Sequence, residues 1–153
     1  MPHRVYSLYN CTIARRSGEE EHMDVIVDTS VLIAVVTNEP TRPRLIELTT
    51  SMQLLAPASV PWEVGNAFSA MLKRKRATLE QVKQALQAYQ QIPVRYVDVD
   101  IERALMIAAQ YELYAYDAYF IVCALQYPGL LLTLDSGLRH AALRAGISVM
   151  EIT

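Results

Sequence analysis

The sequence of 153 residues is poor in cysteine and lacks long apolar runs. Its two cysteines, Cys11 and Cys123, are too few for a disulfide framework, which suits a reducing compartment such as the cytoplasm. Cys123 lies in the apolar run YFIVCAL, where a buried thiol is expected. A charge, proline or glycine breaks every apolar stretch well before the roughly 18 residues that a membrane span requires. We therefore expect a soluble, cytoplasmic protein without a membrane span.

An excess of positive charge is also absent. Fourteen Lys and Arg residues against sixteen Asp and Glu residues give a formal net charge of -2. The chain as a whole therefore offers no bulk attraction to nucleic acid, and any such contact must come from local basic patches. Residues 73–76 (KRKR) and the pair Arg42 and Arg44 are candidates, although basic side chains at a helix end more often lie in solvent.

The chain is long enough for one sizeable core and too short for two ordinary domains. Residues 1–22 have neither an apolar signal segment nor a small-residue cleavage site, and the periodic pattern begins near Met23. We therefore expect an appendage over residues 1–22 and a single domain over residues 23–153.

Short runs of Val, Ile and Leu alternate with segments of helical spacing. Strands are expected over residues 24–27, 53–56, 94–97, 130–133 and 147–150. Helices are expected over residues 30–37, 42–50, 61–74, 79–90, 100–110, 116–126 and 137–145, and Gly129 and Gly146 are expected to stop two of them. This alternation predicts a three-layer α/β/α domain with a central, mostly parallel sheet of five strands.

Four acidic residues stand at strand ends and helix starts of this pattern. Asp28 follows the strand DVIV, and Asp135 follows LLLTL. Glu63 lies in PWEVGNAF and Asp117 in YAYDAYFIVCAL, each near the start of a helix. Because parallel sheets bind ligands beyond the carboxyl ends of their strands, we expect these four acids to share one crevice. An alternative for Asp28 and Asp117 is a purely structural role as helix N-caps.

Four carboxylates in one crevice would repel one another unless a cation held them. The sequence has no pair of Cys or His residues at metal-ligand spacing, so the available donors are oxygens. Oxygen donors favour Mg²⁺, with Mn²⁺ as a second possibility, over zinc. Such sites typically activate water and stabilise a phosphate during displacement, which predicts phosphodiester hydrolysis.

These segments resemble the four acidic motifs of the PIN domain family, most closely those of VapC-type toxins from toxin-antitoxin pairs. The matching segments are VDTSVLIAVVTNEP, PWEVGNAF, YAYDAYFIVCAL and LLTLDSGL, in the family's order within residues 23–152. Ser30 follows the first acid by two residues, and Thr133 precedes the last by two. Each motif is weak alone, whereas the set of four is specific.

The resemblance implies a Mg²⁺-dependent endoribonuclease that a small antitoxin protein holds inactive and that usually forms a homodimer. It further implies that the four acids bind one or two metal ions and that Ser30 and Thr133 orient ligands around them. Asn66, one helical turn after Glu63, is similar to a polar site residue of the family. An antitoxin helix is expected along residues 30–50 and 61–74, on an apolar surface that includes Val31, Leu32, Val35 and Val36.

Other functions fit the residues less well. A receiver domain needs an acidic cluster at its first strand and a late lysine, yet no lysine follows Lys83. A phosphatase with an aspartate nucleophile needs a second Asp two residues later, where this chain has Ser30. A PIN-like module that only binds RNA or a partner, and a housekeeping nuclease that is not a toxin, remain the alternatives. His140 has no Ser or Cys partner for a triad and is expected at the surface or in packing.

The last candidates are aromatic. Tyrosines cluster at positions 111, 114, 116 and 119. Their rings could stack on RNA bases, but tyrosines in such a cluster more often pack against the protein with their hydroxyls in water.

Overall fold

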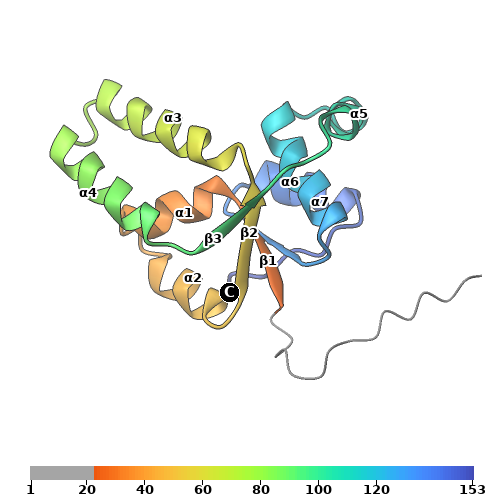
Figure 1. The fold of residues 1–153 in the computed structure, drawn as a ribbon, viewed down its shortest axis with the longest axis horizontal. Helices are drawn as coiled ribbons and strands as arrows, with labels where there is room; N and C mark the ends of the chain where they lie inside the picture. The colour runs from red at the N-terminus through yellow and green to blue at the C-terminus, as the bar shows by residue number, and fades with distance from the viewer. Residues whose placement is uncertain (1–22) are drawn as a thin grey trace, which may run out of the picture.

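The computed structural model describes residues 23–153, which form four strands and seven helices (Figure 1). The strands are β1 (Asp24–Val27), β2 (Gln53–Pro57), β3 (Val94–Val97) and β4 (Leu130–Leu132). The helices are α1 (Thr29–Val36), α2 (Arg42–Thr49), α3 (Val60–Lys73), α4 (Leu79–Gln90), α5 (Ile101–Tyr111), α6 (Ala115–Gln126) and α7 (Ser136–Arg144). The predicted order of the seven helices and the first four strands is confirmed, with boundaries shifted by at most one residue.

All strands of the sheet are parallel and lie in the order β3-β2-β1-β4. Consecutive parallel strands require helical crossovers, which the seven helices supply. In Figure 1, α1 to α4 cover one face of the sheet, and α5, α6 and α7 lie on the other. The predicted three-layer α/β/α arrangement is therefore present.

The prediction of five strands is wrong, because the described residues form a sheet of four. Residues 147–150 approach β4 in parallel but pair with it at one isolated bridge, between Leu131 and Val149. Leu131 donates to the carbonyl of Ser148 at 2.9 Å and accepts from the amide of Met150 at 2.8 Å. Since β4 has only three residues, the ladder cannot extend into a fifth strand, although Ile147 and Met150 are buried in the core.

The core lies between the sheet and its two helical layers. The strands β1 and β4 and the helix α6 contribute its most buried side chains, among them Ile26, Leu131, Phe120 and Ile121. Cys123 is buried there as expected, and burial raises the pKa of its thiol to about 12, so it is an unreactive packing residue. By contrast, β3 is a largely exposed edge strand.

Two glycines near the C-terminal end have different roles. Gly146 follows α7 with φ of +78°, a left-handed conformation that ends the helix as predicted. Gly129 does not stop α6, which ends at Gln126. A Cβ at Gly129 would instead lie 2.5 Å from the carbonyl oxygen of Asp24, so this glycine lets β4 approach β1.

The expected appendage, residues 1–22, lies outside the described residues together with Cys11, and it stays a prediction. Among residues 23–153, no helix has both the length and the apolar composition needed to cross a membrane.

Candidate metal and phosphodiester site

The site begins with Asp28, which directly follows β1 and is only 6% exposed. Ser30 and Thr133 each donate a hydroxyl hydrogen bond to its Oδ2, at 2.5 and 2.7 Å. Thr133 comes from the end of β4, the strand next to β1, where parallel pairing brings both carboxyl ends together. The predicted convergence of Asp28, Ser30 and Thr133 is therefore seen in the structure.

Asp28 occupies the N-cap position of α1 without acting as an ordinary cap. Its side chain makes no capping hydrogen bond to the first turn of the helix. Burial raises the pKa of Asp28, and the negative charge of Asp135 raises it further. Hydrogen bonds from the hydroxyls of Ser30 and Thr133 and from the amide of Thr29 lower this pKa, but burial has the largest effect. A buried carboxylate whose Oδ1 accepts no side-chain hydrogen bond from the described residues points to a functional role.

Glu63 lies in the first turn of α3, half-buried. Its Oε2 accepts a hydrogen bond of 2.8 Å from the hydroxyl of Ser59. Burial raises the pKa of Glu63, the hydroxyls of Ser59 and Thr29 lower it, and the charges of Asp28 and Asp117 raise it. Although α3 begins far from β1 in sequence, its first turn thus faces the same group of acids.

Asp117 lies in the first turn of α6, but the N-cap residue of that helix is Tyr114. The alternative that Asp117 is merely an N-cap is therefore wrong. Burial raises the pKa of Asp117, and the negative charges of Asp135 and Asp28 raise it further. Its carboxylate accordingly lies within electrostatic reach of both.

Asp135 is the exposed member of the group and has a structural task as well. It is the N-cap of α7, and its Oδ1 accepts from the amide of Leu138 at 2.9 Å. Its own amide donates to the hydroxyl of Thr133 at 2.9 Å, the same hydroxyl that binds Asp28. Thr133 therefore links the first and last acids of the group.

These interactions place the four acids at one end of the sheet. Every pair of them interacts electrostatically except Glu63 and Asp135. Within residues 23–153, no three acidic, Cys or His side chains already form a compact metal-binding group. Mutual repulsion of like charges opposes such a group in the metal-free protein. Side-chain rotation toward a shared cation would be needed to close it.

The donor set fits a hard divalent cation. Carboxylate oxygens surround the site together with hydroxyl groups, and sulfur or imidazole ligands are absent from it among the described residues. Thr29 supports this fit, because its Oγ1 is buried and makes no hydrogen bond of normal geometry. That hydroxyl nevertheless lies close enough to lower the pKa of Glu63.

Two polar residues of the site were not among the predicted ones. They are Thr29, which directly follows Asp28, and Ser59, which precedes α3. Ser59 does occupy the N-cap position, but its hydroxyl bonds Glu63 and caps no backbone amide. The Ser-x-x-x-Glu spacing, which puts both side chains on one face of a helical turn, is the signal that could have revealed it.

The other predicted residues lie apart from the acids. Residues 73–76 are exposed at the far end of α3. Arg42 donates to Asn38 at 2.9 Å, and Arg44 pairs with Glu47 at 2.9 Å, so both serve local contacts. His140 is exposed, in agreement with the surface interpretation.

The aromatic candidates divide into two groups. Tyr116 borders a hollow of about 290 Å³ that also contains Glu63 and Asn66. Tyr119 packs edge-on against Tyr116, with ring centroids 5.7 Å apart. Tyr111 stacks with the guanidinium of Arg144, at 5.3 Å, away from that hollow.

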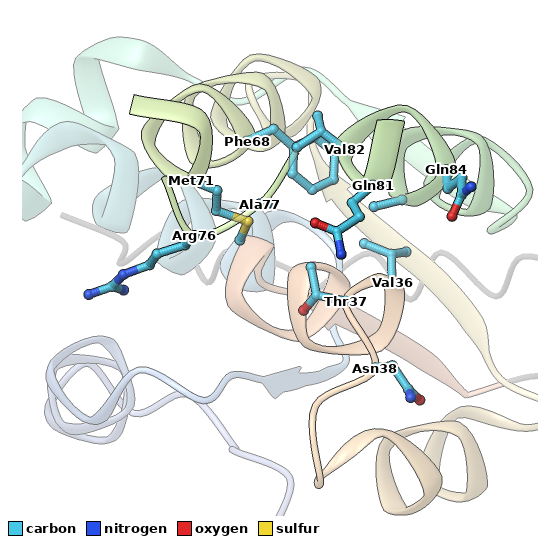
Figure 2. A pocket seen from close by; sticks show the side chains of 11 residues that line it. Val36, Thr37, Asn38, Phe68, Met71, Arg76, Ala77, Gln81, Val82 and Gln84 are labelled. Carbon is cyan, nitrogen blue, oxygen red and sulfur yellow. The ribbon is translucent and has the colours of Figure 1, made fainter. Parts of the chain in front are cut away.

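Two larger hollows lie elsewhere and contain none of the four acids. One, of about 380 Å³, lies between the end of α1, the end of α3 and the start of α4; Figure 2 shows Val36, Phe68, Met71 and Val82 in its lining. The other, of about 460 Å³, is lined mainly by α1, α2 and the segment around residues 88–93. The first has a mixed lining, apolar side chains beside Asn38, Arg76 and Gln81, and the second is mainly apolar. Both linings suit a binding surface for a peptide better than a catalytic site.

Of the four valines and leucines expected on the antitoxin surface, two belong to the core. Val31 and Leu32 are each only 2% exposed. Val35 and Val36 are half-buried, and each borders one of the two larger hollows. The apolar surface is therefore narrower than the sequence pattern indicates.

Several solved structures share this fold. PAE2754 from Pyrobaculum aerophilum has a TM-score of 0.60 at 18% identity, over 81% of this chain and 90% of that one. FitAcB from Neisseria gonorrhoeae has a TM-score of 0.60 at 18% identity, over 84% of this chain and 97% of that one. VapBC2 from Rickettsia felis, bound to a DNA fragment from its promoter, has a TM-score of 0.58 at 12% identity, over 84% of this chain and 98% of that one.

A search among curated proteins found no significant match. The sequence model of the PIN domain, in contrast, matches residues 25–143, which include all four acids and every strand from β1 to β4. This match covers most of the described residues and agrees with the fold of the solved structures. The chain belongs to the PIN domain family.

Proposed function

We propose that this protein is a Mg²⁺-dependent endoribonuclease and the toxin of a VapBC-type toxin-antitoxin pair. One observation carries the proposal. Four carboxylates from four separate elements influence one another electrostatically at the carboxyl end of the sheet, and one of them, Asp28, is buried there at the cost of a raised pKa. Folding alone gives no reason to gather these charges, whereas a cation site does.

In this proposal Asp28, Glu63, Asp117 and Asp135 hold the metal, directly or through water. When bound, Mg²⁺ supplies an activated water molecule and stabilises the charge of the phosphate. Mn²⁺ has the same preference for oxygen ligands and is expected to substitute for it.

The hydroxyl groups around Asp28 position its carboxylate. Ser30 and Thr133 both donate to Oδ2, which restricts rotation of the carboxylate and leaves Oδ1 free of these two hydroxyls for a metal ion. The hydroxyl of Ser30 also accepts from the amide of Leu134 at 3.1 Å, so the loop after β4 is tied to the start of α1. Ser59 orients Glu63 in the same manner.

The experiment is cleavage of RNA by the purified full-length protein in Mg²⁺, compared with the variants Asp28→Asn and Asp117→Asn. Both variants should lose cleavage while circular dichroism shows a native fold, because each change removes a ligand and preserves the shape of the side chain. Glu47→Gln, on the exposed face of α2, is the matched control and should cut RNA normally.

Cleavage that survives excess EDTA, or wild-type rates in either site variant, would contradict a metal-dependent nuclease. If the wild type binds RNA but does not cut it, the result would favour the alternative of a PIN-like module that only binds RNA. Cleavage by a protein whose expression does not slow bacterial growth would favour a housekeeping nuclease over a toxin.

An antitoxin partner is supported by the toxin-antitoxin complexes among the structural relatives. We place it on the apolar hollow of Figure 2, between α1, α3 and α4, which offers Phe68, Met71 and Val82 to a partner side chain. Ala77→Trp should fill this hollow and weaken rescue of growth by the product of the adjacent reading frame. Gln87→Trp, exposed on α4 and outside both larger hollows, is the control and should be rescued normally.

A homodimer is part of the same proposal. The helix α5 leaves Ile101, Leu105 and Met106 from 52% to 67% exposed, an apolar stripe that a second copy could cover. Light scattering should then report a dimer for the full-length protein and a monomer for Leu105→Glu.

A further inference from the structure

The hollow beside Glu63 has an unusual lining for the surface of a folded domain. Its volume is about 290 Å³, and it is lined by Thr29, Trp62, Glu63, Asn66, Ala67 and Tyr116. Glu63 belongs both to this hollow and to the acid cluster, so the two adjoin each other. A ligand that occupies the hollow would therefore lie next to the proposed metal site.

Two large aromatic side chains border this hollow without contributing to the core. Trp62 is 78% exposed and Tyr116 is 56% exposed. Tyr116 is held by Tyr119, whose ring packs against it at 5.7 Å and an interplanar angle of 88°. Because burial of these rings does not stabilise the fold, their faces are available to a ligand with an aromatic face of its own.

The polar groups of the hollow also fit a ligand with an aromatic ring. Asn66 lies one helical turn after Trp62, on the same side of α3, and its amide can both donate and accept hydrogen bonds. The volume is close to the lower end of the range for small-molecule pockets, about 300–1,000 Å³, which suits one planar ring system. No positive side chain lines the hollow, so a phosphate group is not its natural occupant.

We propose that this hollow binds one unpaired nucleobase of the RNA substrate, next to the phosphodiester bond that is cut. Trp62 and Tyr116 stack on the base, and Asn66 contacts its edge. The proposal rests on the proposed ribonuclease function and adds to it the side chains that hold a base beside the cut bond. A base within a duplex would not fit, because neighbouring pairs cover both of its faces.

The chain contains a single tryptophan, so the fluorescence of Trp62 reports on this hollow directly. Full-length protein carrying Asp28→Asn, which should leave RNA uncut, is titrated with a short single-stranded RNA oligonucleotide and with the same oligonucleotide paired to its complement. Stacking should quench Trp62 with the single strand and leave it largely unchanged with the duplex. Equal quenching by both, or none by either, would overturn the proposal.

Variants test the two rings separately. In the Asp28→Asn background, Tyr116→Ala should weaken binding of the single strand by about 5- to 150-fold, the usual effect of losing one stacking ring, and Tyr116→Phe should bind normally. Tyr114→Ala is the matched control, since Tyr114 is 86% exposed nearby and does not line the hollow. Trp62→Ala is measured by anisotropy of labelled RNA and should resemble Tyr116→Ala.

The two proposals fail in different ways. If the wild type cuts RNA and both alanine variants cut single strands with unchanged kcat/KM, the base-binding hollow is wrong and the nuclease stands. If single strands quench the fluorescence of Trp62 but no RNA is cut, the proposed nuclease function is wrong and the proposal of base binding in the hollow is supported. Quenching by the antitoxin and by no RNA would overturn the hollow as a base site and assign it to the protein partner.

Discussion

The hydroxyl of Thr133 donates a hydrogen bond of 2.7 Å to Oδ2 of Asp28, which lies 105 residues earlier in the chain. The same hydroxyl accepts from the amide of Asp135 at 2.9 Å. One small side chain at the end of β4 thus fixes the buried acid of β1 and the start of the loop that carries the last acid. Four predictions follow from this contact and its neighbours.

Thr133→Val should destabilise the protein by about 1–3 kcal/mol, because the amide of Asp135 loses its acceptor and the buried Oδ2 of Asp28 keeps only one of its two hydroxyl donors. It should also reduce RNA cleavage, since Asp28 loses one of the two hydroxyls that orient it. Urea denaturation at neutral pH without metal measures the first effect. Thr49→Val is the control, because the hydroxyl of Thr49 bonds only carbonyls of its own helix. Equal stability of the two variants would show that the Thr133 contact contributes nothing.

Ser59→Ala should shift the acid limb of the pH–rate profile to higher pH. The Ser59 hydroxyl lowers the pKa of Glu63, which burial raises, so its removal lets that pKa rise further. Cleavage should then fall most at mildly acid pH and recover as the pH increases. Ser69→Ala is the control, since Ser69 lies on the same helix and bonds the carbonyl of Asn66. A uniform loss of rate at every pH would contradict this role for Ser59.

Asp135→Asn and Asp135→Ala should differ in stability but not in activity. Asn can still cap α7, and it removes one of the charges that raise the pKa values of Asp28 and Asp117, so this variant should be at least as stable as wild type in EDTA. Ala loses the hydrogen bond from Leu138 and should cost about 0.5–2 kcal/mol relative to Asn. Both should fail to cut RNA. Wild-type cleavage by Asp135→Asn would remove Asp135 from the site.

Stability of the metal-free protein should increase as the pH falls from neutral toward mildly acid values. The folded pKa values of Asp28, Glu63 and Asp117 lie above the ordinary values of 3.8, 4.5 and 3.8. Protonation therefore favours the folded state: the stabilising contribution is fully present below about pH 4 and is lost as the pH rises through the raised folded values.

In the proposed site Mg²⁺ would bind the ionised acids of the folded protein, and it should therefore reverse this loss at neutral pH. Each 1 kcal/mol that Mg²⁺ adds to the free energy of unfolding should raise Tm by about 2–4 °C for a chain of this size. The gain should be much smaller at mildly acid pH, where protons compete for the carboxylates. Melting curves in EDTA and in Mg²⁺ at both pH values measure these effects, and a Mg²⁺ effect that is the same at both would contradict metal binding by these acids.

The sequence already contained the alternation of strands and helices, because apolar periodicity and proline or glycine positions are local properties. It also singled out Asp28, Glu63, Asp117 and Asp135, since an acid after an apolar strand or inside an apolar helix is unusual in the sequence itself. It did not reveal that Ser59 serves Glu63, nor that Gly129 permits a close approach to Asp24, because these depend on side-chain direction and on contact between strands.

The tertiary structure decided what local patterns leave open. The run over residues 147–150 has strand composition, yet a three-residue β4 gives it only one bridge, so pairing partners and not composition limit the sheet to four strands. Val31 and Leu32 look identical to surface apolar residues in sequence and are buried by the helices packed around α1. The raised pKa values of Asp28, Glu63 and Asp117 exist only because folding brings these three acids out of water and within reach of other negative charges. The sequence alone therefore determined which residues are candidates, and the parallel pairing of β1 with β4 brought Asp28 into contact with Thr133.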